Sequence, residues 1–133
     1  MTETNEVWRT MRRMVAPYGR FKRIENRCEI GTPDVNYTLL HPFGLQGWVE
    51  LKLFPKNGNP PPHLTLDQII WGENEVRVGG RWHLFGRCDK HWRLYDTIGA
   101  RRLFERRAPD PIFNISGRFP LTELLQVLGD RRQ

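Results

Sequence analysis

The sequence predicts an α/β protein with a single domain, and three observations support this prediction. The chain has 133 residues, a length at which one modest hydrophobic core is expected. Two short runs, 35–39 and 48–53, alternate between apolar and polar residues as half-buried strands do. Three longer runs, at about 5–16, 65–79 and 120–128, carry apolar residues at helical spacing between start and stop signals.

The first third of the chain predicts a helix followed by a strand. Thr4 or Asn5 is a suitable N-cap, and Pro17 ends the helix after about residue 16. Residues 21–28 alternate imperfectly and predict a strand. The stiff Gly31-Thr32-Pro33 bend then delivers Asp34 to the next strand.

The two alternating runs define the candidate site. Glu50 and Lys52 lie two residues apart and therefore project from one face of the second strand, while Asp34 begins the first. Charges gathered and buried in this way are costly unless they pair or a cation joins them. The sequence therefore predicts a metal site beside a lysine. A hairpin loop over 41–47 makes the two strands antiparallel, but a symmetric turn would set Asp34 nearer Leu53 than Glu50, so the register stays open.

The second half of the chain continues the same succession of strands and helices. Thr65 and Gln68 fit a capping box that opens the helix over 65–79. Residues 81–89 and 91–97 form a hairpin around a tight turn at 89–90, and a short helix follows over 99–107. We expect the domain core to span about 5–107, with a C-terminal linker and helix over 108–129.

The charge of the chain indicates a polyanionic partner. The formal net charge is +6 and the pI is about 9.9, and much of the excess is clustered arginine. The predicted phosphate contacts are Arg101, Arg102, Arg106 and Arg107 on the short helix, and Lys56 in the Pro/Gly-rich segment 54–63. A solvated helix face would explain the same arginines without a partner.

Composition also limits the classes of protein that this chain can represent. No run approaches the ~18 apolar residues of a membrane span, and the N-terminus has no signal-peptide pattern, so a cytoplasmic protein is expected. Cys28 and Cys88 are expected to be buried thiols, and His91 alone near Cys88 does not make a zinc site. We expect neither membrane contact nor a nucleotide cofactor.

The order of these motifs resembles a known nuclease superfamily. Gly31, Pro33-Asp34, Glu50-Leu51-Lys52 and Leu64-Thr65 followed by Gln68 are similar to the PD-(D/E)XK pattern. Within that superfamily the chain resembles the VRR-NUC (virus-type replication-repair nuclease) family, which includes small phage and prophage proteins. The resemblance implies a restriction-endonuclease-like fold, in which helices flank a mixed β-sheet.

The resemblance also implies roles for individual residues. Asp34, Glu50 and the backbone carbonyl of Leu51 would bind Mg²⁺, or Mn²⁺ in its place. Lys52 would orient or help deprotonate the attacking water, and Gln68 would support the water, the metal or the phosphate.

One further acidic residue is implied on the first helix. Glu6 is its best match here, and Glu25 is a competitor because it also precedes the motif.

The function implied is a Mg²⁺-dependent, structure-selective DNA endonuclease that resolves four-way (Holliday) junctions as a homodimer. Two opposed strands require two active sites, which a dimer supplies. A flap or duplex nuclease would have the same catalytic residues. A non-catalytic basic module that binds nucleic acid would have the same arginine clusters, and a plain ion-pair network on a sheet face would explain Glu50 and Lys52.

Overall fold

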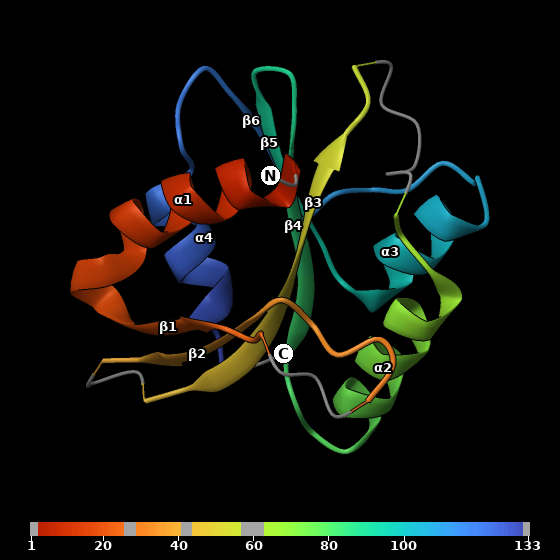
Figure 1. Ribbon diagram of the computed structural model, residues 1–133, viewed down its shortest axis with the longest axis horizontal. Coiled ribbons are helices and arrows are strands. Elements are labelled where there is room, and N and C mark those ends of the chain that lie inside the picture. Colours follow the sequence, from red (N-terminus) through yellow and green to blue (C-terminus); the bar gives the residue numbers. More distant parts are fainter. Residues whose placement is uncertain (1–2, 26–28, 41–43, 57–62, 132–133) are drawn as a thin grey trace.

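The computed structural model describes residues 3–25, 29–40, 44–56 and 63–131. In this part of the chain, six strands form one sheet, and helices lie on both of its faces (Figure 1). The elements in chain order are α1 (Glu3–Val15), the short 3₁₀ helix η1 (Ala16–Tyr18), β1 (Gly19–Arg23), β2 (Val35–Leu39), β3 (Gln46–Phe54), α2 (Leu66–Arg77), β4 (Trp82–Cys88), β5 (His91–Tyr95), α3 (Thr97–Phe104), β6 (Phe113–Ser116) and α4 (Leu121–Leu128).

The sheet is mixed and its strands follow the chain order from β1 to β6. The central pair β3 and β4 is parallel, and α2 crosses over between its two strands. The remaining neighbouring pairs are antiparallel. This arrangement confirms the predicted fold class, a mixed sheet flanked by helices within one domain.

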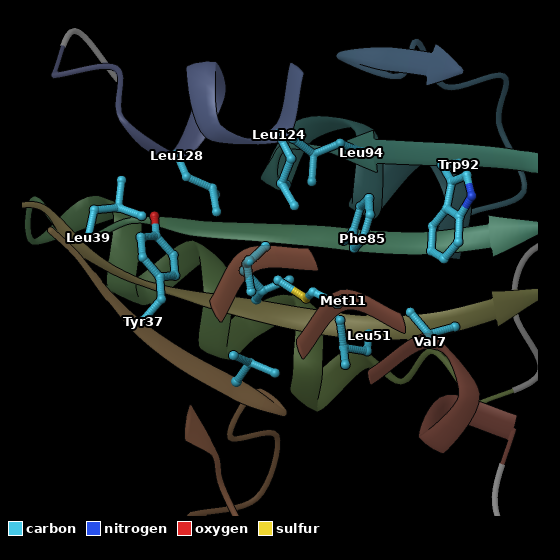
Figure 2. Packing of buried hydrophobic residues seen from close by; sticks show 13 residues of the cluster. Val7, Met11, Tyr37, Leu39, Leu51, Phe85, Trp92, Leu94, Leu124 and Leu128 are labelled. Atoms are coloured by element: carbon cyan, nitrogen blue, oxygen red, sulfur yellow. The ribbon is translucent and has the colours of Figure 1, made fainter. Parts of the chain in front are cut away.

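Two hydrophobic clusters attach the helices to the sheet. The larger one joins α1 and α4 to one face, with Val7, Met11, Leu51, Phe85 and Leu124 fully buried at its centre (Figure 2). The smaller one lies on the opposite face, beneath α2 and α3. Strand β3 separates the two layers, since its alternate side chains enter one cluster or the other.

The C-terminal segment belongs to the core, which corrects the prediction that the core ends at about residue 107. Strand β6 pairs with β5, and Leu124 and Leu128 of α4 are fully buried in the larger cluster. The guanidinium of buried Arg81 donates from Nη2 to the carbonyls of Val127 and Leu128, each over 2.9 Å. These bonds satisfy terminal carbonyls that an α-helix leaves without partners.

The register of β2 against β3 is the feature of the fold that matters most for the site. Val35 pairs with Val49, so one further step sets Asp34 opposite Glu50. Strand β3 begins at Gln46, inside the predicted loop, and Gly47 fits there because a Cβ would collide with the Tyr37 hydroxyl. The early start shortens the turn and resolves the register question.

Some predictions fall outside the described residues. Strand β1 spans Gly19–Arg23, whereas the sequence predicted a strand over 21–28. The last three residues of that prediction, which include Cys28, lie outside the described residues. Residues 41–43 and 57–62 are also outside. Cys88 is a buried free thiol, as expected. None of the helices in the described segments is long and apolar enough to cross a bilayer.

Candidate active site

Strand β3 presents Glu50 and Lys52 on the face covered by α2 and α3, while Leu51 between them enters the opposite cluster. Both charged side chains are almost completely buried, with exposed fractions of 1% for Glu50 and 5% for Lys52. Lys52 Nζ lies 3.2 Å from Glu50 Oε2 and donates a hydrogen bond to the carbonyl of His63 over 3.0 Å. The lysine is therefore held by two partners and directed at the carboxylate.

Asp34 lies at the start of β2 and accepts a backbone hydrogen bond from β3. The N–H of Leu51 donates to Asp34 Oδ2 over 2.9 Å. In the antiparallel register the residue before Asp34 would lie opposite Leu51, so the Asp34 side chain takes the place of a backbone partner. The N–H and C=O of one strand residue point to the same side of the strand. The Leu51 carbonyl therefore also points toward the start of β2, beside the Asp34 carboxylate.

The environment of Glu50 disfavours its ionised form. Burial raises the pKa of Glu50 well above its usual range, the negative charge of Asp34 raises it further, and the ammonium of Lys52 offsets part of both effects. Within the described residues, Glu50 Oε1 is buried and has no hydrogen-bond partner. A buried carboxylate oxygen without a partner is costly, unless a group outside the chain satisfies it.

These residues fit a small divalent cation. Carboxylate and carbonyl oxygens are the ligands that Mg²⁺ and Mn²⁺ prefer, and a cation would both satisfy Oε1 and neutralise the two carboxylates. Asp34, Glu50 and the Leu51 carbonyl are the groups placed to hold it. In the segments that the structure covers, no three His, Cys, Asp or Glu side chains gather, so water or substrate would complete the shell.

Gln68 combines the roles of helix cap and site residue. Its backbone N–H donates to Thr65 Oγ1 over 3.2 Å, and its Oε1 accepts from the Thr65 N–H over 3.0 Å, which is the predicted capping box. The same amide also reaches the site, because Nε2 lies 3.4 Å from Glu50 Oε2. The cap thus fixes the orientation of the amide that faces Glu50.

Glu6 is not brought to this cluster, contrary to its predicted place there. Its side chain is 59% exposed and forms an ion pair of 3.2 Å with Arg87. Arg87 aligns with Leu53 in the parallel register and therefore shares the face that α1 covers, opposite to Glu50. The ion pair with Arg87 accounts for the position of Glu6.

Glu25, the predicted competitor of Glu6, follows a residue whose backbone is hydrogen-bonded to Asp34. The N–H of the preceding Ile24 donates to the Asp34 carbonyl over 2.8 Å. The Glu25 side chain is exposed and lines a groove beside α1, where it joins no cluster of three metal-binding side chains within the described residues.

The predicted phosphate-binding arginines on α3 are engaged unequally. The guanidinium of Arg101 donates to both carboxylate oxygens of Glu73 on α2, over 2.6 and 2.8 Å. Arg101 also lies 3.5 Å from Glu105, and Arg107 lies 3.6 Å from the same carboxylate. Arg101 therefore links α3 to α2 through Glu73, an ion pair that the sequence did not predict. Arg102, Arg106 and Lys56 are exposed.

Two contacts of the site were not predicted from the sequence. The His63 carbonyl positions Lys52, but a backbone carbonyl carries no residue-type signal. The Leu51 N–H positions Asp34 and depends on a register that the hairpin pattern alone did not determine.

The fold is similar to that of a solved nuclease. The chain matches the 1.6 Å structure of Hjc from Archaeoglobus fulgidus, described as a Holliday junction resolvase from an archaeal hyperthermophile. The TM-score is 0.55 at 13% sequence identity, over 96% of this chain and 97% of the resolvase. No protein-family model matches the sequence, and no curated protein matches it significantly. The likeness therefore concerns the fold.

Proposed function

We propose that this protein is a Mg²⁺-dependent DNA endonuclease that hydrolyses phosphodiester bonds, with four-way junctions as its preferred substrate. One observation carries the proposal: Asp34 and Glu50 meet at the start of β2 beside Lys52, and Glu50 keeps a buried oxygen without a partner in the described chain. The fold that holds them resembles that of a junction resolvase.

The residues of the chain have distinct parts in the proposed reaction. Asp34, Glu50 and the Leu51 carbonyl would hold the cation, which supplies charge neutralisation and a lowered pKa of bound water. Lys52, fixed by Glu50 and the His63 carbonyl, carries the positive charge that stabilises the phosphate as negative charge develops on it. Gln68 orients Glu50 through its amide. A central strand holds these groups more rigidly than a loop would.

We infer that the protein acts as a homodimer, since one chain carries one such site and two opposed strands must be cut. Placement in the VRR-NUC family and a phage origin stay predictions that rest on the motif order in the sequence.

Cleavage assays test this proposal. A labelled four-way junction, a linear duplex and a flap of the same sequence would be incubated with Mg²⁺ or with EDTA. We expect paired symmetric nicks in the junction, abolished by EDTA and slowed about 10²–10³-fold in Lys52→Ala. Equal cutting of all three substrates would support the nuclease activity and refute the preference for junctions. Binding without any cutting would refute the nuclease.

A further inference from the structure

A groove of about 540 Å³ lies between α1 and the end of β1, and the proposed catalytic residues do not line it. This size is within the range of pockets that hold small organic groups. Helix α1 lies on the side of the sheet that α4 also covers, and β1 is the edge strand of that sheet (Figure 1). The groove is lined by Asn5, Trp8, Arg9, Arg12, Arg23, Ile24 and Glu25.

The lining of the groove carries an excess of positive charge. Two elements supply its arginines: Arg9 and Arg12 come from α1, and Arg23 comes from β1, whereas Glu25 is the only carboxylate among the described residues of the lining. Among the described residues, neither Arg12 nor Arg23 forms an ion pair. Guanidinium groups converging from two elements suit the tetrahedral oxygens of a phosphate.

Protection of the sheet edge is a competing structural explanation. Strand β1 is the edge strand, and charged side chains on such a strand discourage pairing with further chains. This explains Arg20 and Lys22, which are exposed on the opposite face of β1. It does not explain why Arg12 of α1 lines the same groove as Arg23, so edge protection accounts for only part of the charge.

The groove adjoins the candidate active site through the backbone. Ile24 lines the groove, and its N–H donates to the carbonyl of Asp34 over 2.8 Å. The groove lies on the face of the sheet that α1 covers, opposite to Glu50, so a strand of nucleic acid bound there would reach the metal site by passing around the end of the edge strand β1. Half-buried Trp8 adds an aromatic surface to the groove, and such surfaces take up bases or sugars regardless of sequence.

We propose that this groove binds the sugar-phosphate backbone of the nucleic-acid strand that enters the active site, with Arg12 and Arg23 as its phosphate contacts. The inference rests on the proposed function and deepens it, since it names the surface that receives the substrate. It moves the main phosphate contacts away from α3, where Arg101 is held by Glu73.

The test compares two double variants that remove the same charge. Arg12→Ala with Arg23→Ala and Arg102→Ala with Arg106→Ala each lower the formal net charge from +6 to +4. Binding of a labelled duplex would be followed by fluorescence anisotropy in EDTA over a range of NaCl concentrations. We expect the groove variant to flatten the slope of log affinity against log salt by about 1.8, and the α3 variant to change it much less. The double variant Arg12→Lys with Arg23→Lys should keep most of the wild-type slope.

A second variant tests the groove in the opposite direction. Glu25→Gln removes the negative charge from the lining and should tighten duplex binding several-fold, with an unchanged unfolding temperature because Glu25 is exposed. An unchanged affinity of Glu25→Gln, or equal slopes in the two double variants, would overturn the proposal.

Because binding is measured in EDTA, the two proposals fail separately. If the wild-type protein binds DNA through the groove but never cuts it, the proposed nuclease activity is refuted and the proposed binding by the groove is retained. A wild-type protein that cuts, with unaltered binding by the groove variant, would refute only the groove.

Discussion

The Asp34 carboxylate accepts a hydrogen bond of 2.9 Å from the backbone N–H of Leu51, so a side chain takes the place of a strand partner at the start of β2. This contact helps to position the carboxylate and satisfies the buried N–H of Leu51 in β3. Asp34 thus contributes to the stability of the sheet as well as to the candidate metal site.

Two substitutions of Asp34 should separate these contributions. Asp34→Asn keeps an oxygen that accepts from Leu51, whereas Asp34→Ala leaves the buried N–H without its partner. We expect Asp34→Ala to lower the free energy of unfolding by about 1–3 kcal/mol and Asp34→Asn to lower it much less. Urea unfolding in EDTA measures this difference. Equal stability of the two variants would show that the hydrogen bond contributes little.

The raised pKa of Glu50 predicts a pH-dependent stability of the metal-free protein. Between the unfolded pKa of about 4.3 and the higher folded pKa, the native state holds a proton that the unfolded chain has released. Stability should therefore fall as the pH rises through this window. Mg²⁺ needs the ionised carboxylate, so the stabilisation that it adds should grow as the pH rises.

Thermal unfolding from pH 5 to 8, with and without Mg²⁺, checks this prediction. Glu50→Gln is the control, because it removes the titrating group and should abolish the metal-dependent shift. A Mg²⁺ effect that is independent of pH, or that persists in Glu50→Gln, would contradict the assignment.

Variants of Gln68 and Thr65 separate the two roles of Gln68, as part of the helix cap and as a residue of the site. Thr65→Ala and Gln68→Ala both break the capping box, and each should cost about 0.5–2 kcal/mol of stability. Only Gln68→Ala also removes the donor that lies 3.4 Å from Glu50. We expect Gln68→Ala to lower kcat further than Thr65→Ala and to shift the acidic limb of the pH–rate profile. Equal losses of kcat in both variants would show that Gln68 acts only as a helix cap.

The sequence predicted the parts of the site that depend on local pattern. Period-two alternation placed Glu50 and Lys52 on one face of β3, and the capping box located Gln68 at the start of α2. Both features involve neighbours in the chain, so no long-range information was required.

The sequence failed to predict features that depend on contacts between residues far apart in the chain. The position of Glu6 depends on which face of the sheet α1 covers, and its contact with Arg87 joins residues 81 positions apart. The ion pair of Arg101 was likewise not predicted, because the sequence does not reveal that α2 brings Glu73 beside it. The burial of α4 similarly depends on contacts with strands that are distant in the chain.

The central claim is that Asp34 and Glu50 form one divalent-cation site beside Lys52. Calorimetric titration of Mn²⁺ into the wild-type protein and into Asp34→Asn at about pH 7.5 tests it most directly, because metal binding needs deprotonated ligands and is favoured as the pH rises. We predict one binding event per chain in the wild type and its loss, or at least a roughly tenfold weakening, in Asp34→Asn, which should keep the fold because Asn still accepts from Leu51. Equal binding of the metal by both proteins would contradict the claim.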